Sequence, residues 1–553
     1  MTDSMGRLVL LLILICASFS AFAQSDRDVY FGETHMHTSW SIDAFAISGS
    51  TFNGPEEAYR YARGETINHP VGYPIQITEP LDWIGVTEHA EYLGAFKLAA
   101  DPDSILHKKH RYWANTIASG LSIKPLATYM VLGKSMAAGN KIDALQDPDV
   151  IASVWKEIVQ IADNYYEPGK FTTFAAYEWT ASPNNQNMHR NVFFRDSAKV
   201  PEVILDAIDS GDPWNLWMWM EEQRRQGNEL LAIAHNGNLS GGLMYPTETD
   251  LAGRPIDALW AEHRRRNEPL TEIKQGKGTS ETTTLLSPSD EFADYELLEW
   301  VLLGGSGVPK QYGSYVRQAY RDGLVMQGIG GFNPARFGLV AGADTHNGAA
   351  GYRQDNWTGM HGTMDGTADM RLSPIKQMGL DNRQLGPPGL SAVWADENTR
   401  EAIFDGMKRR ETYATSGVRI RLRFFGGWDF DSGLLQQDDW VTRGYASGAA
   451  MGTDLPAKSG DAPTFVVHAL KDPDSGNLDR VQIVKGWSDR GQSFEKIFDV
   501  AWSGDRELNP DTNRVGPVGT TVNLSDATYS NSIGATELKA VWTDPDFDPA
   551  LDA

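Results

Sequence analysis

Short apolar runs that end in a histidine or an acidic residue recur along this 553-residue chain. Runs of about four to eight apolar residues bounded by polar ones are typical of buried strands. When such strands are parallel, their carboxyl ends meet at one edge of the sheet, so the residues that follow them converge. The runs and their endings are 29–32 with His35 and His37, 83–87 with Glu88 and His89, 171–177 with Glu178, 230–234 with His235, and 338–341 with Asp344 and His346. The pattern therefore indicates a fold in which several strand ends share one edge.

Helical stretches separate these runs, which is the pattern of an α/β fold with a parallel sheet. Further strands are predicted at 191–194 and 297–301, and helices at 55–63, 151–165, 213–226, 311–322 and 398–410. The last helix has Asn398 at the position of an N-cap and basic residues in its final turn, as the helix dipole favours.

Three insertions interrupt this alternation, and a different pattern follows it. Residues 95–150 look helical, residues 240–290 are polar and loop-like, and residues 347–390 are rich in Gly, Met, Asp and Pro. The last segment directly follows His346, so we expect a mobile lid at the mouth of a site. Alternating residues at 420–425, 464–470 and 481–485 predict a β-rich region over 416–553, after a first domain over 24–415.

The N-terminus, residues 1–23, has the features of a signal peptide. Arg7 precedes an apolar run, and Ala21-Phe22-Ala23 forms a cleavage site before Gln24. That run is too short to span a bilayer comfortably, and no other segment reaches the roughly 18 apolar residues of a membrane span. The only cysteine, Cys16, falls in the removed segment, so we expect no disulfide in the mature chain. The sequence predicts a periplasmic or secreted protein.

The net charge of the chain is −24. Nucleic acids and anionic membranes repel such a surface, so neither is expected as a partner. Bound divalent cations would neutralise part of this charge. A small molecule is the expected partner, and the oligomeric state stays open.

The candidate site residues are imidazoles and carboxylates. His35 and His37 flank Met36 in a strand-like segment, so their side chains leave on the same face. Asp43 lies shortly after this pair, and His189 lies eleven residues after Glu178. Without cysteine, this mixture suits Zn²⁺, Mn²⁺ or Fe²⁺, and the ligands exceed the needs of one metal ion.

The order of these motifs resembles that of the PHP (polymerase and histidinol phosphatase) superfamily over about residues 29–415. The matching motifs are His35-x-His37-Thr38, Thr87-Glu88-His89, Tyr177-Glu178, His189, Ala234-His235-Asn236 and Gly342-Ala343-Asp344-Thr345-His346. Within that superfamily the chain is similar to an exported branch. The segment from Glu401 to Gly417 is also similar to the tail of carbaryl-hydrolase-type PHP proteins.

The resemblance implies a distorted seven-stranded (β/α) PHP-type barrel with helical and loop insertions, a C-terminal β-rich segment, and two or three divalent metal ions (Mn, Zn or Fe). It assigns the first metal to His35, His37, Glu178 and Asp344, the second to Glu178, His189 and His235, and the third to Asp43, His89 and His346. Two residues depart from the family pattern. Asp43 lies one residue further from the histidine pair than the usual acid, and Glu88 stands where an Asp usually precedes the histidine.

These observations predict an exported metal-dependent hydrolase, with hydrolysis of a phosphate mono- or diester as the expected reaction. Glu178, Asp344 and His235 are the expected catalytic residues. Two alternatives stay open: hydrolysis of a carbamate or carboxylic ester at the same metal centre, and a non-catalytic metal-dependent binding module. No serine-nucleophile, P-loop or dinucleotide-binding motif competes with this interpretation.

Several residues near the motifs receive more ordinary predictions. Glu33 either faces the site or is solvated, and Arg190 is expected to point away from His189. Asn236, Asn347 and Arg353 are candidates for substrate contact. The remaining histidines are predicted to lie at the surface or in local hydrogen bonds: His69, His107, His110, His263, His361 and His468.

Overall fold

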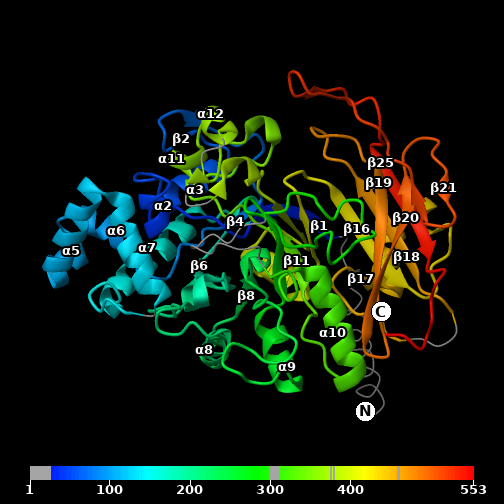
Figure 1. Ribbon diagram of the computed structural model, residues 1–553, viewed down its shortest axis with the longest axis horizontal. Coiled ribbons are helices and arrows are strands. Elements are labelled where there is room, and N and C mark those ends of the chain that lie inside the picture. The colour runs from blue at the N-terminus through cyan, green and yellow to red at the C-terminus, as the bar shows by residue number, and fades with distance from the viewer. Residues whose placement is uncertain (1–26, 139, 299–309, 374–375, 378–379, 458–460) are drawn as a thin grey trace, which may run out of the picture.

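The structure is a computed structural model that describes residues 27–138, 140–298, 310–373, 376–377, 380–457 and 461–553. The predicted signal peptide and most of the strand expected at 297–301 lie outside the described residues. The described part is a mixed α/β structure (Figure 1). Its C-terminal strands gather on one side, and helices α5 (Ile105–Ile123) and α6 (Pro125–Ala137) lie at the opposite end. Among the described residues, no helix has the length and apolarity needed to cross a membrane.

One sheet has five strands and contains the first strand of the described chain. Its order is β15 (Thr412–Thr415), β14 (Leu390–Ala395), β1 (Asp28–Glu33), β4 (Trp83–Gly85) and β5 (Thr172–Phe174). β1 is parallel to β4 and β4 to β5, as the α/β pattern predicted. β14, which the sequence analysis did not predict, runs antiparallel between β1 and β15.

The second sheet has six strands and supplies the rest of the site. Its order is β10 (Gly278–Thr279), β9 (Leu270–Gln275), β8 (Leu230–Ala234), β7 (Arg190–Phe194) and β6 (Ala176–Trp179), with β11 (Gly338–Ala341) paired to β9. β8, β9 and β11 are parallel, whereas β7 runs antiparallel to both of its neighbours. The sheet is therefore mixed rather than parallel throughout.

The closed seven-stranded barrel that the resemblance implied is not seen in the described residues. The single stretch predicted at 171–177 divides at Ala175 into β5 and β6, which belong to different open sheets. Isolated bridges join Met36 to Thr345, and His89 to Glu178 of β6. The two sheets therefore also meet where the predicted site residues lie.

A cluster of buried apolar side chains fills the space between the two sheets. It combines Trp83 and Phe174 of the first sheet with Phe193 and Val340 of the second, and Phe404 of helix α13 (Arg400–Arg409) packs against it. Arg195, just after β7, pairs with Asp405 of this helix at 3.0 Å. Because His189 lies just before β7, α13 and the site residues lie at opposite ends of the strands.

All five predicted helices are present with shifted ends. They are α3 (Pro55–Ala62), α7 (Pro148–Tyr165), α8 (Pro213–Arg225), α10 (Val316–Gly330) and α13. The N-cap of α13 is Thr399, whose side chain accepts from Ala402 N, so the prediction of Asn398 was wrong by one residue. Asn398 instead donates to the carbonyl oxygens of Asp82 and Lys170.

The insertions differ in how well the sequence described them. Residues 95–150 are helical, with α4 (Ala95–Ala100), α5 and α6. The segment 240–290 is not loop-like, because it contains α9 (Ala258–Asn267) and β9. The shorter elements elsewhere are α2 (Ile42–Ala46), β2 (Ile67–Asn68), β3 (Pro74–Ile75), α11 (Gly362–Asp365), α12 (Ala368–Leu372), β12 (Lys376–Gln377) and β13 (Leu380–Asp381).

The C-terminal β-rich region is present. Its main sheet contains β17 (Ala449–Ala450), β16 (Arg421–Gly427), β18 (Thr464–Leu470) and β25 (Glu537–Thr543), beside a hairpin of β19 (Arg480–Asp489) and β20 (Gln492–Trp502). Helix α14 (Trp440–Ser447) and the short strands β21 (Leu508–Asn509), β22 (Arg514–Val515), β23 (Val522–Asn523) and β24 (Thr528–Tyr529) complete it. The hairpin packs on α10, where Arg317 pairs with Glu495 at 2.8 Å. A domain boundary near residue 415 stays a proposal.

Arg190 points away from the site residues into a buried ion pair, which gives the first testable prediction. Its Nε donates to Glu268 Oε1 over 2.9 Å, and both side chains are almost fully buried. Arg190→Met leaves Glu268 with Arg264, 3.4 Å away, as its charged partner and with the indole N–H of Trp217. Removing one partner of a buried pair costs about 3–5 kcal/mol, so we expect about 3 kcal/mol less unfolding free energy by chemical denaturation.

Arg195→Met provides the matched control for this prediction. Arg195 and Asp405 are 33% and 44% exposed, and exposed pairs contribute about 0–1 kcal/mol. Equal destabilisation by the two variants would contradict a dominant role for the buried pair.

Candidate metal centre

Six described strands place the predicted residues at one end of the two sheets. β1 leads to His35 and His37, β4 to His89, β8 to His235, and β11 to Asp344 and His346, while Glu178 lies within β6. His189 precedes β7 instead of following it. Because β7 is antiparallel to β6 and β8, its first residue lies beside their last residues, so His189 reaches the same end.

The segments beyond β1 and β11 are joined by main-chain hydrogen bonds. His37 N donates to Thr345 O over 2.9 Å, and Asp344 N donates to His35 O over 2.8 Å. Asp344 has a φ of +53°, in the left-handed region that side chains seldom adopt. This strained turn brings its carboxylate toward the histidine pair and is held by the paired segments.

Glu178 is the centre of the cluster. Its Oε2 lies 3.0 Å from His37 Nε2 and 3.2 Å from His35 Nε2. The other oxygen, Oε1, lies within 3.5 Å of three further imidazole nitrogens, those of His189 at 2.9 Å, His235 at 3.4 Å and His89 at 3.5 Å. One carboxylate therefore faces five imidazoles from both sheets.

Two other carboxylates complete the cluster. Asp344 Oδ1 lies 3.5 Å from His35 Nε2 and 3.6 Å from His346 Nδ1. Asp43 Oδ2 lies 3.0 Å from the Nε2 atoms of both His89 and His346. The longer spacing of Asp43 from the histidine pair thus does not keep it away from the site.

All nine predicted residues therefore belong to one connected cluster. Eight are buried, and the side chain of Asp43 is 15% exposed. Three sets of ligand atoms lie within 4.8 Å of one another: those of His35, His37 and Asp344; of His35, Glu178 and His235; and of His37, His89 and His346. His35 and His37 each occur in two sets, which differs from the implied assignment of each to the first metal alone.

The charges and donors of the cluster fit divalent metal ions. Glu178, Glu272 and Asp344 are buried within or beside it. Among the described lysines and arginines, one forms an ion pair with any of the nine residues: Lys277, which pairs with Asp344. His235 is also buried, and neither of its ring nitrogens makes a hydrogen bond with a described residue. Excess buried negative charge and a buried imidazole with no hydrogen-bond partner both match a cation-binding site.

Electrostatics keep the central carboxylate ionised. Burial alone would raise the pKa of Glu178, but His89, His235 and His189 hold it well below its usual value. Burial lowers the pKa of His37 well below its usual value, and the neighbouring His89 and His346 lower it further. An ionised carboxylate and a neutral imidazole are the forms that bind metals.

Further side chains orient these imidazoles. Glu272 Oε2 lies 3.1 Å from His35 Nδ1, Ser41 Oγ lies 3.1 Å from His37 Nδ1, and Thr180 Oγ1 lies 2.6 Å from His89 Nδ1. Such partners fix the ring orientation of metal-binding histidines. Sequence reasoning missed Glu272 because it placed β9 in a loop, and the segment LTEIKQ lacks the apolar alternation that would have signalled a strand.

Two acids beside the motifs hold the main chain. Glu33 Oε1 accepts from His35 N over 2.7 Å and from Ala343 N over 3.0 Å, while Tyr352 donates to Oε2. Glu33 is fully buried rather than solvated, and burial raises its pKa to about 8. Glu88 accepts from Thr38 N and thereby braces the turn after His37.

The first half of the segment after His346 lies beside the cluster, as predicted, and is packed there; its mobility stays a prediction. His346 N donates to Met360 O over 2.7 Å, and the rings of His346 and His361 lie 4.9 Å apart. Met360 is fully buried, and His361 is 8% exposed. The prediction that His361 lies at the surface or in local hydrogen bonds was wrong, since no motif marked it and the fold alone brings it to the cluster.

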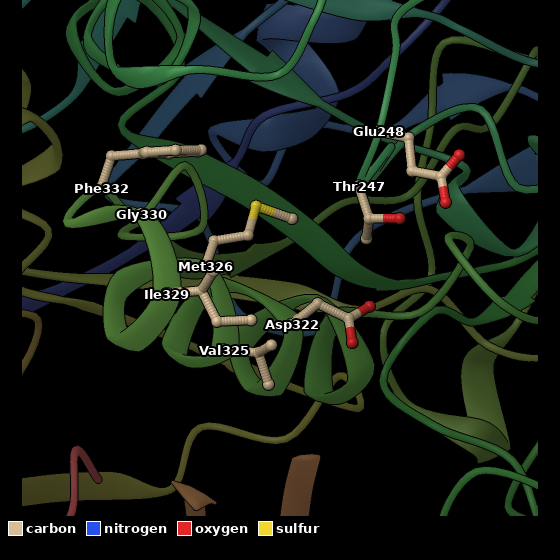
Figure 2. Close-up of a pocket in the computed structure, with 8 residues that line it drawn as sticks. All are labelled: Thr247, Glu248, Asp322, Val325, Met326, Ile329, Gly330 and Phe332. Atoms are coloured by element: carbon tan, nitrogen blue, oxygen red, sulfur yellow. The ribbon is translucent and has the colours of Figure 1, made fainter. Parts of the chain in front are cut away.

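The three candidates for substrate contact have other partners. Asn347 Nδ2 donates to Gly359 O, Asn236 Oδ1 accepts from Asn187, and Arg353 pairs with Asp355. A separate hollow of about 420 Å³ lies beside α10, with Val325, Met326 and Ile329 in its lining (Figure 2). None of the nine cluster residues lines it.

The fold and the cluster define a mixed α/β protein with clustered His, Glu and Asp ligands suited to divalent metal ions. A family model described as "Protein of unknown function (DUF3604)" matches residues 24–553, so the chain belongs to the DUF3604 family. No curated protein matches it. A Bacteroides vulgatus two-domain protein, described as containing a predicted PHP-like metal-dependent phosphoesterase, aligns at 9% identity with a TM-score of 0.31, over 94% of this chain and 96% of that chain. A likeness this low does not establish a shared fold.

Proposed function

We propose that this protein is an exported metal-dependent hydrolase that acts on phosphate mono- or diesters. The observation that supports it most is the position of Glu178, whose two oxygens face five imidazoles at the centre of nine converging ligands. The PHP-like order of the motifs in the sequence supports the phosphoester class.

The proposed metal ligands follow the three carboxylates. Glu178 and Asp344 with His35 and His37 would hold one ion, Glu178 with His189 and His235 a second, and Asp43 with His89 and His346 a third. When bound, such ions supply a hydroxide at neutral pH and stabilise charge on a phosphoryl oxygen. Mn²⁺, Zn²⁺ and Fe²⁺ suit this imidazole-rich donor set.

The protein's own residues prepare the site for this chemistry. In the hydrolysis, a bond forms between a water oxygen and phosphorus, the ester P–O bond breaks, and the leaving oxygen takes up a proton. Glu178 and Asp344 supply the negative charge that holds cations, and burial keeps His235 neutral by lowering its pKa. Glu272 and Ser41 keep His35 and His37 turned toward Glu178.

Export is part of the same proposal and rests on the features of residues 1–23. We expect the mature protein in the periplasm or the medium, with Gln24 as its first residue. Cell fractionation followed by N-terminal sequencing tests this. Recovery of the uncleaved chain in the cytoplasm would contradict it.

A substrate panel tests the proposed reaction. Purified protein reconstituted with Mn²⁺, Zn²⁺ or Fe²⁺ should hydrolyse 4-nitrophenyl phosphate or bis(4-nitrophenyl) phosphate faster than a nitrophenyl carboxylate or an aryl carbamate. Faster turnover of the carbamate or carboxylate would favour the activity suggested by the carbaryl-hydrolase-like segment that ends at Gly417. Bound metal without turnover of any substrate would favour the binding-module alternative.

A further inference from the structure

We propose that Lys277, together with His361, binds an anionic oxygen of the substrate, so that the site selects anionic phosphate esters over neutral esters. This inference rests on the proposed function and specifies how the same site recognises its substrate. Neither residue belongs to a motif that led to the nine predicted ligands.

A tight turn places Lys277 at the cluster. Gly276 and Lys277 connect β9 to β10, which begins at Gly278, and a Cβ atom on Gly276 would lie 2.5 Å from Met360 Sδ. Gly278 has a φ of +93°, which favours glycine. The main chain of Lys277 is held on both sides, because its N donates to Gln275 Oε1 and its O accepts from Asn238. The direction of its side chain is therefore set by the fold.

The ammonium group meets the outer oxygen of a proposed metal ligand. Lys277 Nζ donates to Asp344 Oδ2, whereas Asp344 Oδ1 faces His35 and His346. Lys277 is only 8% exposed. An ammonium has three N–H donors, and the structure records one acceptor for this one among the described residues. The remaining donors are available to a further acceptor at the edge of the cluster.

His361 gives a second, independent indication that a ligand binds at this edge of the cluster. It is buried, its ring lies 4.9 Å from that of His346, and its Nδ1 has no hydrogen-bond partner among the described residues. The two residues reach the same carboxylate edge: Met360, next to His361, packs on Gly276, next to Lys277, and Asp344 lies 3.6 Å from His346 while accepting from Lys277. An imidazole and an ammonium at the same edge of the cluster can both donate to an oxyanion.

The charge of the substrate decides what such a pair selects. A phosphate diester carries one negative charge at neutral pH, and it enters a site whose buried carboxylates would repel it. The Lys277 ammonium attracts an ionised phosphate oxygen by the Coulomb interaction of two opposite charges, in addition to the hydrogen bond. A neutral carboxylic ester or carbamate offers only a carbonyl oxygen, so Lys277 favours the phosphate ester.

The test compares Lys277→Met with Lys274→Met in the full metal-loaded chain. Lys274 lies in the same hairpin and is also buried, but it pairs with Glu296 rather than with the cluster. Binding of inorganic phosphate is measured by calorimetry, and bound metal per chain by elemental analysis. We expect Lys277→Met to weaken phosphate binding about 10-fold or more while retaining its metal, as loss of a charged hydrogen bond predicts. Lys277→Arg should retain most of the binding, and Lys274→Met all of it.

Three outcomes would overturn the proposal: unchanged phosphate binding in Lys277→Met, a matching loss of metal, or no phosphate binding by the parent protein. If Lys277→Met does not fold, the Lys277→Gln and Lys277→Arg pair decides by the same criteria. Phosphate binding does not require turnover. Weakened binding in a protein that hydrolyses no ester would therefore refute the proposed function and leave the role of Lys277 standing.

Discussion

Glu178→Gln is expected to weaken metal binding by at least about 100-fold and to abolish hydrolysis. Glutamine keeps the shape of the side chain but removes the charge that faces five imidazoles. Loss of a partner that only orients a metal ligand costs about 10–100-fold in affinity, and a shared ligand should cost at least as much. Bound metal per chain after equilibrium dialysis, together with the rate on a nitrophenyl phosphate, measures the effect.

Asp43→Asn is the comparison variant for this prediction. Asp43 faces two imidazoles and lies at the partly exposed edge of the cluster. Its loss should affect one bound ion and leave the others in place. Equal metal loss in the two variants, or a greater loss in Asp43→Asn, would contradict the central position assigned to Glu178. Thermal unfolding of both variants shows whether either change acts through the fold.

Removal of metal is expected to abolish activity and to destabilise the fold. Among the described residues, Lys277 is the one lysine or arginine paired with a carboxylate of the nine-residue cluster. We therefore expect bound cations to neutralise most of the repulsion between the buried carboxylates. At a metal concentration of about 1,000 times the dissociation constant, binding adds about 4 kcal/mol to the unfolding free energy. Thermal unfolding and ester hydrolysis before and after chelation measure both effects.

Reconstitution supplies the control for this experiment. Mn²⁺, Zn²⁺ or Fe²⁺ should restore activity and stability more effectively than Mg²⁺, because Mg²⁺ prefers oxygen ligands and retains its waters. Full activity in a strong chelator, with an unchanged melting temperature, would refute a metal-dependent reaction. Activity lost without any change in melting temperature would indicate that the ions serve the reaction alone.

The cluster residues could be chosen from the sequence because their signal is local. A polar residue directly after a buried strand must lie near the end of that strand, as His235 does after β8 and Asp344 does after β11. The alternation of side chains in extended backbone likewise places His35 and His37 on one face. No knowledge of strand order is needed for either inference.

Strand order and direction were decided by pairing between distant segments. β9 lies between β8 and β11, although its own residues looked loop-like, and it brings Glu272 to His35. β7 runs antiparallel, so the site receives His189 from the start of a strand. The division of the stretch at 171–177 between two open sheets also escaped the sequence pattern, because β5 and β6 pair with different partners.

The sequence by itself determined the chemistry of this protein, namely a set of imidazoles and carboxylates delivered by strand ends. Only the tertiary structure decided what surrounds that set. Lys277 reaches Asp344 through a glycine-rich turn, and His361 reaches His346 through the packed segment that follows β11. Neither contact leaves a local pattern in the sequence. Lys277 and Asp344 are 67 residues apart and meet only when β9 and β11 pair. The metal ligands follow from local strand geometry, whereas the groups proposed to choose the substrate follow from packing.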